Sequence, residues 1–212
     1  RCESYEQGVC PMGVLFITQG VDCQIDRLEV STWGWGKGEE SYFIDHVVLY
    51  GDPHQAEVWK QLEIVINQHY EHENGKSLVP VISAIDSGGL HTSEVYQFAR
   101  EKVAQGVIAI KGQSQANKPA IGRPTRVDIN FRKANRAIKK GGKVYPLGVD
   151  TIKNTLMGRL KNNKIGSYGY VHFYASTTEE YFKQITAERH ILKSNRSGFQ
   201  MPQWVKKAGV RN

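Results

Sequence analysis

Short apolar runs of strand length, separated by an amphipathic stretch, constrain the fold of this chain more than any other feature. The runs VPVISAI (79–85) and VIAI (107–110) are almost continuously apolar, which is typical of β-strands in a sheet. Between them, residues 92–103 place Val95, Phe98 and neighbouring apolar residues at helical spacing. This strand–helix–strand order predicts an α/β sheet.

Three further strands are predicted ahead of this unit, at about 13–22, 26–35 and 40–50. The glycine-rich stretch 34–38 reads as a hairpin turn, so these strands should form an antiparallel meander. A helix is expected from Asp52-Pro53 as far as Asn74-Gly75. The predicted fold class is therefore α/β, with a mixed sheet flanked by helices.

After residue 111 the pattern weakens. Residues 112–143 read as an irregular basic insertion, followed by a strand at Val144-Tyr145. Asp150 is expected to cap a helix that runs to about Leu160. A strand at 171–174 and a helix near 179–188, capped by Thr177 or Thr178, complete the prediction.

Length and composition indicate one globular domain over residues 1–212. The chain has 212 residues, of which 40% are hydrophobic and 23% charged, and this is ordinary for a folded protein. No apolar stretch reaches the roughly 18 residues of a membrane span, and no signal peptide is visible. Three cysteines without paired spacing favour a reducing compartment and free thiols. Because the chain begins at Arg1, we expect a piece of a longer protein.

Positive charge is concentrated in one segment. Between positions 111 and 143 there are ten basic residues against one acid, so this segment alone carries a formal charge of +9, whereas the whole chain carries +7. A solvated loop would explain the charge, but a surface that contacts phosphates explains it better. The residues expected to bind DNA are Lys111, Lys118, Arg123, Arg126, Arg132, Lys133, Arg136, Lys139 and Lys140.

Two aspartates stand at the ends of apolar strands. Asp22 follows the first predicted strand, and Asp86 follows the run 79–85. Ligands of open α/β sheets gather at such strand ends, and two carboxylates that meet there need a cation. Oxygen ligands suit Mg²⁺ or Mn²⁺, and a pair of such ions can hydrolyse a phosphodiester. A turn-forming role for each aspartate is the alternative.

Two weaker candidates lie near these acids. Asp26, four residues after Asp22, is expected to start the next strand, with metal contact as the minor alternative. His91 follows the Ser87-Gly88-Gly89 turn, where it could reach the metal or a phosphate, although a lone histidine is more often a cap or a surface group.

Three stretches together carry a family resemblance: TQGVDCQIDRLEVSTWGWGKGEESYFIDHVVLYGDP, AIDSGGLHTSEVYQFAR and VIAIKG. They resemble the nuclease domain of the lambda-type large terminase subunit of tailed phages and prophages. The resemblance implies a ribonuclease-H-like fold and metal-dependent cutting of concatemeric viral DNA during packaging. It assigns metal binding to Asp22 and Asp86, and it places Lys111 and Gly112 beside the site.

The resemblance also implies partners and a compartment. These are double-stranded DNA, a small terminase subunit, a portal and an ATPase motor domain, all in the cytoplasm of the bacterial host. The motor domain is absent from this chain, which contains no GxxxxGK[ST] motif. The family's remaining acidic ligand lies past a sequence like Arg211-Asn212. We therefore expect the third acid beyond Asn212, with Asp150 as the substitute and a weakened metal site as the consequence.

Two other functions remain open from the sequence. The chain could be a DNA-gripping module without catalysis, its acids serving only as turn residues. It could also be another ribonuclease-H-like nuclease, such as a resolvase or transposase.

Overall fold

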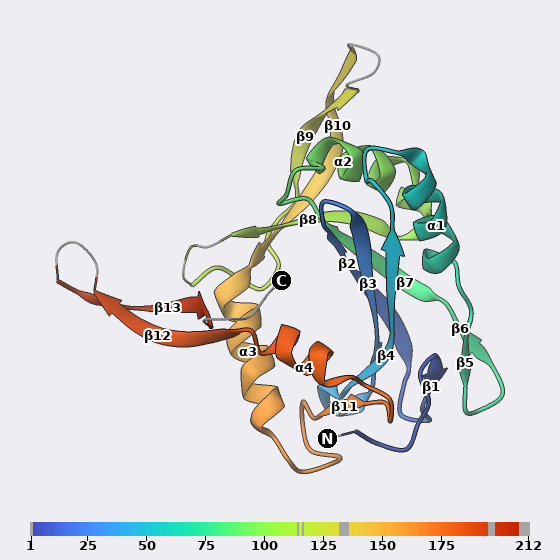
Figure 1. The fold of residues 1–212 in the computed structure, drawn as a ribbon, viewed down its shortest axis with the longest axis vertical. Helices are drawn as coiled ribbons and strands as arrows, with labels where there is room; N and C mark the ends of the chain where they lie inside the picture. The colour runs from blue at the N-terminus through green and yellow to red at the C-terminus, as the bar shows by residue number, and fades with distance from the viewer. Residues whose placement is uncertain (1, 114, 116, 132–135, 195–197, 208–212) are drawn as a thin grey trace.

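The computed structural model describes residues 2–113, 115, 117–131, 136–194 and 198–207. Within them, an eight-stranded sheet has the order β11-β4-β3-β2-β7-β8-β10-β9 (Figure 1). In chain order its strands are β2 (Phe16–Cys23), β3 (Arg27–Trp35), β4 (Ser41–Tyr50), β7 (Pro80–Asp86), β8 (Val107–Gln113), β9 (Thr125–Phe131), β10 (Arg136–Gly148) and β11 (Val171–Phe173). A small second sheet contains β1 (Val9–Cys10), β5 (Tyr70–His72) and β6 (Ser77–Leu78). A hairpin joins β12 (Glu188–Ser194) to β13 (Gln200–Lys206).

The main sheet is mixed because its strands are connected in two ways. Strands β2, β3 and β4 form an antiparallel meander. Strand β7 then pairs in parallel with β2, and β8 pairs in parallel with β7, which requires crossover connections of helical length. The middle of the sheet therefore has the order β4, β3, β2, β7, β8: the three meander strands come first, and the two parallel strands follow. The predicted α/β class is confirmed.

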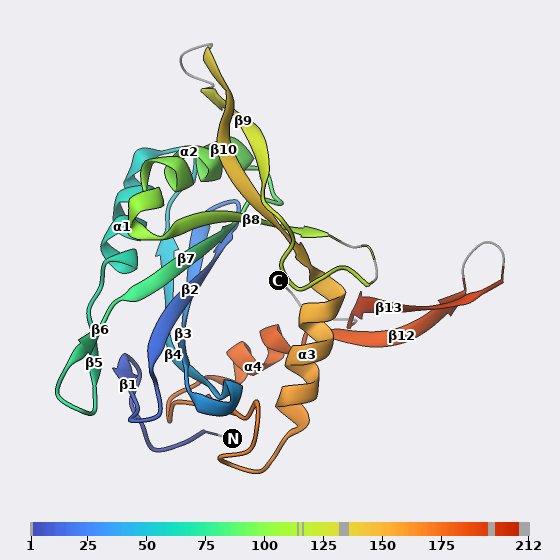
Figure 2. The same cartoon turned by 180° about the vertical axis from the view of Figure 1, so that it is seen from behind.

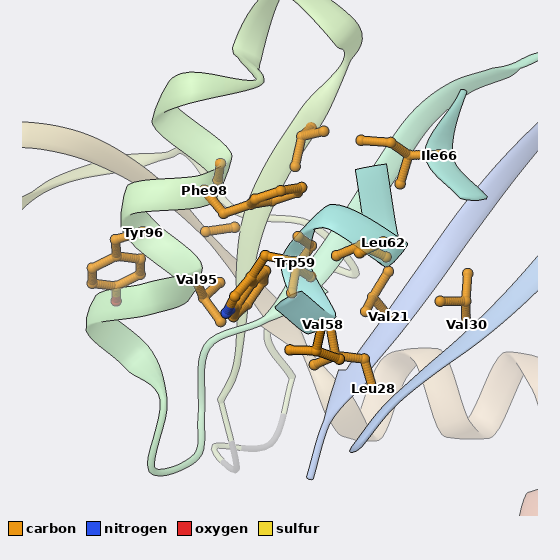
Figure 3. Packing of buried hydrophobic residues seen from close by; sticks show 14 of the residues in the cluster. Val21, Leu28, Val30, Val58, Trp59, Leu62, Ile66, Val95, Tyr96 and Phe98 are labelled. Atoms are coloured by element: carbon orange, nitrogen blue, oxygen red, sulfur yellow. The ribbon is translucent and has the colours of Figure 1, made fainter. Parts of the chain in front are cut away.

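Helices α1 (Ala56–Ile66) and α2 (Thr92–Glu101) cover one face of this sheet. Trp59 of α1 and Phe98 of α2 pack together, with ring centroids 5.1 Å apart. Figure 3 shows Val21 and Leu28 of the meander beside these helices, and both belong to the same buried cluster. Because side chains alternate along a strand, Val21 enters this core and Asp22 points to the other face of the sheet.

The opposite face is covered at its β4 and β11 side by α4 (Glu179–Ile185). Tyr181 of α4 stacks on Phe43 of β4, with ring centroids 4.1 Å apart, and Phe173 of β11 joins the same cluster. The predicted cap of this helix is confirmed, since the Thr178 hydroxyl accepts a hydrogen bond from the Tyr181 amide at 3.2 Å.

The predicted irregular insertion is instead largely a β-hairpin, formed by β9 and the first part of β10. We call this hairpin the basic arm; Figures 1 and 2 show that it extends away from the body of the molecule. Its inner residues follow strand alternation, and Ile129 is fully buried against the α2 side of the core. The high charge had masked that alternation in the sequence. After β10 the chain enters α3 (Val149–Lys161).

The first helix also differs from its prediction. Asp52 does not cap it, because its carboxylate accepts a hydrogen bond from the His54 amide at 2.8 Å within a turn, and α1 begins only at Ala56. The helix ends at Ile66, and three of the residues expected to continue it, Tyr70–His72, form β5 instead. Among the described residues, no helix is long and apolar enough to cross a membrane.

The buried face of α1 gives a test of this packing. Leu62 is fully buried, whereas Ile64 on the same helix is 74% exposed. We expect Leu62→Ala to lower the free energy of unfolding by about 2–5 kcal/mol, and Ile64→Ala to change it by less than about 0.5 kcal/mol. Urea denaturation followed by circular dichroism measures both, and equal losses would contradict the assigned inner face of α1.

Candidate active site

The register of β2 and β7 brings Asp22 and Asp86 together. Val21 pairs with Ile85, so the two aspartates occupy the next position along adjacent parallel strands. Neighbours at the same level of parallel strands point to the same face. Both carboxylates therefore lie at the carboxyl end of the sheet, on the face opposite α1 and α2.

The pKa of the Asp22 carboxyl is shifted by its surroundings at this end of the sheet. Burial raises its pKa above the ordinary value, and the negative charges of Asp86 and Glu29 raise it further. A hydrogen bond from the Gln24 side-chain amide opposes the shift. The Asp22 residue is nevertheless exposed to solvent. Neighbouring residues at the carboxyl end of the sheet therefore surround this carboxyl only in part.

Glu29 is an acid of this site that the sequence reasoning missed. It pairs directly with Asp22 across the β2–β3 hairpin, and opposite residues of an antiparallel pair share one face. Its carboxylate is held by Arg27, with Nε and Oε1 2.7 Å apart. The sequence does contain a signal for this pairing, because Asp22 and Glu29 are equidistant from the centre of the turn that joins the two strands.

The turn after β7 is built around the Asp86 carboxylate. The Gly88 amide donates a hydrogen bond to Asp86 Oδ1 at 2.9 Å. A Cβ atom at position 88 would lie 3.2 Å from that oxygen, so glycine leaves room beside it. The Ser87 hydroxyl donates to the Ile110 carbonyl of β8 at 2.8 Å, which fixes the turn to the sheet.

Asp26 and His91, the two weaker candidates from the sequence, are not paired with Asp22 or Asp86 in the sheet. Asp26 is exposed in the β2–β3 turn, and its carboxylate pairs with Arg27 at 2.8 Å. His91 is 5% exposed and directly precedes α2. Its ring lies beside His54, with centroids 4.4 Å apart.

Asp150 and Lys111 lie toward the same end of the sheet as the paired acids. Asp150 is in the first turn of α3, two residues after Gly148. Gly148 pairs with Gln113, which is three residues past Ile110, the partner of Asp86. Asp150 is thus two strands away from Asp86 and farther along the sheet. Lys111 is exposed and directly follows Ile110 on β8.

The basic residues expected to bind DNA fall largely on the basic arm and the loop before it. Arg123, Arg126, Lys139 and Lys140 are exposed, as is Lys143 farther along β10, whereas Lys118 is half-buried. Arg136 begins β10, and nothing is described of its side chain. Arg132 and Lys133 lie outside the described residues. The described members thus form a positively charged projection from the sheet that bears the paired acids.

The donor set at the paired acids fits a hard divalent cation. Asp22, Asp86 and Glu29 offer carboxylate oxygens, which Mg²⁺ and Mn²⁺ prefer. Burial is the main cause of the raised pKa of Asp22, and the negative charges of Asp86 and Glu29 add to it; a cation between Asp22 and Asp86 would offset both effects.

The fold and these acids define a class, that of α/β proteins with carboxylates gathered at the carboxyl end of a mixed sheet. The family model described as "Terminase large subunit gpA, endonuclease domain" matches residues 1–212. The chain therefore belongs to this family of terminase nuclease domains.

Similar proteins agree with this assignment. The large terminase subunit of Escherichia phage lambda is 32% identical over 201 residues, which cover 91% of this chain and 29% of that protein. The large terminase subunit of Enterobacteria phage P21 is 30% identical over 151 residues, covering 71% of this chain and 22% of its own length. The chain thus spans less than a third of either relative.

A solved structure, the g2p (large terminase) nuclease domain from the bacteriophage SPP1 with bound Mn, aligns with 94% of this chain and 88% of its own. Its TM-score is 0.40 and its sequence identity 11%, values too low to support an assignment of site residues.

The raised pKa of Asp22 predicts how stability depends on pH when divalent ions are chelated. Between the ordinary carboxyl pKa of 3.8 and the raised native value, the folded protein binds more protons than the unfolded chain. Stability therefore falls as the pH rises through this window. Asp22→Asn removes the carboxylate whose ionisation costs stability. The variant should therefore have a higher free energy of unfolding than the wild type at neutral pH, and the same value below pH 3.8.

The matched control is Asp26→Asn, which removes an exposed carboxylate that is paired with Arg27. Asp26→Asn should not raise the free energy of unfolding at neutral pH. Chemical denaturation of both variants in a chelator at several pH values measures the difference, and a destabilised Asp22→Asn protein at pH 7 would contradict this account of the site.

Proposed function

We propose that the chain is a divalent-metal-dependent endodeoxyribonuclease domain that cuts concatemeric viral DNA during genome packaging. The observation that carries the proposal is the parallel pairing of β2 with β7, which sets Asp22 beside Asp86 at an exposed sheet end. Membership of the terminase nuclease family supports the same reaction.

In this proposal, Asp22 and Asp86 would hold Mg²⁺ or Mn²⁺, with a pair of ions as the expected complement. When bound, the ions supply Lewis-acid stabilisation of the phosphate and activation of water. The protein's part is to orient the ligands. The Gln24 amide fixes Asp22, and the Gly88 amide fixes Asp86. Asp22 is exposed and Asp86 half-buried on this face, so a DNA phosphate would have access to both.

Three carboxylates are candidates for the third ligand of the metal. Asp150 and an acid beyond Asn212 were the candidates from the sequence. Glu29 joins them because it lies opposite Asp22 and is held in place by Arg27. Glu29→Gln, Asp150→Asn and a longer chain that continues past Asn212 separate the three by their effect on Mn²⁺ affinity.

The basic arm would hold the DNA backbone without reading its sequence. Its basic side chains Arg126, Lys139, Lys140 and Lys143 are exposed on a projecting hairpin, against one exposed acid, Asp128, among its described residues. Contacts from such basic side chains bind phosphates regardless of base. Choice of the cutting site would then come from partners: a small terminase subunit, a portal and the ATPase motor domain of the full-length protein in the host cytoplasm.

Cleavage of supercoiled plasmid tests the catalytic part. We expect nicking in Mn²⁺ or Mg²⁺, and a loss of more than about 100-fold in Asp22→Asn and Asp86→Asn, since even groups that only orient metal ligands are worth about 10- to 100-fold. Agarose gels measure the rate of nicking, and Asp26→Asn is the control that should retain it.

Two results would change the assignment. If neither this chain nor one extended past Asn212 nicks DNA in any divalent metal while both still bind it, the domain is a DNA-gripping module. If branched DNA is cut far faster than linear duplex, a resolvase is the better assignment.

The basic arm carries a separate prediction about salt. Changing Lys139 and Lys143 to Gln should reduce the slope of log affinity against log salt by about 2, because each lost phosphate contact removes about one unit. Fluorescence anisotropy with a labelled duplex measures the slope. The same change at Lys60 and Lys76, exposed lysines outside the basic arm, should leave it unaltered. Equal slopes in both double variants would place the DNA elsewhere.

A further inference from the structure

A second cluster of potential metal ligands lies on the other face of the sheet from the paired acids. It contains His54, from the loop before α1, and His91 and Glu94, at the start of α2. One ligand atom from each residue lies within 4.8 Å of the other two. His54 and His91 are 37 positions apart in the sequence, so no local pattern brings them together.

The geometry of this cluster is already close to that of a metal site. His54 Nδ1 and Glu94 Oε1 are 3.0 Å apart, and the two imidazole rings have centroids 4.4 Å apart at an angle of 64°. Tetrahedral ligands with bonds of about 2.0–2.2 Å lie about 3.3 Å from one another. The longest separation in the cluster therefore needs to shorten by at most about 1.5 Å, which the exposed His54 side chain can provide.

Burial supplies an independent reason to expect a ligand. Glu94 Oε2 is buried, and within the described part of the chain it accepts no hydrogen bond. A buried carboxylate oxygen without a partner is costly. The ion pair between His54 and Glu94 accounts for Oε1 alone, whereas a cation held by the three side chains would also compensate Oε2.

Both segments that carry the ligands are held firmly. The Gly51 amide donates to the Asp26 carbonyl at 2.9 Å, and the Trp59 indole donates to the Pro53 carbonyl at 2.8 Å. On the α2 side, the Thr92 hydroxyl lies 2.9 Å from the carbonyl oxygens of both Ser87 and Gly89. A site built on such anchored segments loses little conformational entropy when it binds an ion.

The donor set distinguishes this cluster from the paired acids. Two imidazoles and one carboxylate suit Zn²⁺ and similar transition metals, whereas Mg²⁺ prefers oxygen ligands alone. We propose that His54, His91 and Glu94 form a zinc site, separate from the acidic centre, that clips the loop before α1 to the start of α2.

The clip would act on the acidic centre through the backbone. The segment 87–91 runs from the turn that supports Asp86 to the histidine that begins α2. Fixing His91 and Glu94 to His54 therefore fixes the far end of that turn. Cys23 lies between the two sites: burial, together with the negative charges of Asp22, Glu94 and Asp86, raises the pKa of its thiol to about 12.

Zinc titration tests the proposal without any assay of cleavage. After treatment with a chelator, the protein should bind one Zn²⁺ per chain in isothermal titration calorimetry, and its Tm should rise with free zinc. His54→Ala and Glu94→Gln should each weaken this binding by more than about 10-fold. His54 is exposed, so His54→Ala should fold normally. His69→Ala, which removes another exposed histidine, should bind zinc like the wild type.

The double variant Asp22→Asn/Asp86→Asn separates this site from the acidic centre. It should retain zinc binding, so the zinc site can stand even where the proposed nuclease reaction fails. The inference is overturned if no zinc binds, if His54→Ala and Glu94→Gln bind it as the wild type does, or if only the double aspartate variant loses it.

Discussion

The parallel pairing of β2 with β7 is the constraint on which the rest of the structure depends. It places Val21 beside Ile85 in the core under α1 and α2. By alternation, it sends the next residue of each strand, Asp22 and Asp86, to the opposite face. The same backbone hydrogen bonds thus serve the core and the acidic site. A shift of one residue would bury two carboxylates and expose two aliphatic side chains, so the core itself fixes the position of the acids.

Much of this sheet could be predicted because its strands are short, apolar and bounded by turns. The basic arm could not, since its strand alternation rests on few inward residues, such as Val127 and Ile129, within a dense run of charge. The start of α1 was misplaced for a different reason. An Asp-Pro pair serves equally as a helix start or as a turn, and here the His54 amide selects the turn.

Some residues of the site could be predicted from local sequence, whereas others depend on how the strands and loops pair in the fold. Asp22 and Asp86 were candidates because each ends its own apolar run, which is a local property. Glu29 was not, since its position opposite Asp22 appears only once the hairpin register is known. The cluster of His54, His91 and Glu94 forms because the loop before α1 contacts the start of α2. No periodicity in the sequence predicts that contact.

The carboxyl end of β2 and β7 therefore presents two chemically different donor sets on opposite faces. The carboxylates of Asp22, which is exposed, and Asp86, which is half-buried, lie on the face away from α1 and α2. Imidazoles lie on the helix-covered face, where His91 is buried. Ligand type then sorts the metals: hard ions favour the first set, and zinc favours the second. Because residues 87–91 connect the two, an ion on the covered face would stiffen the turn that orients Asp86 without competing for its carboxylate.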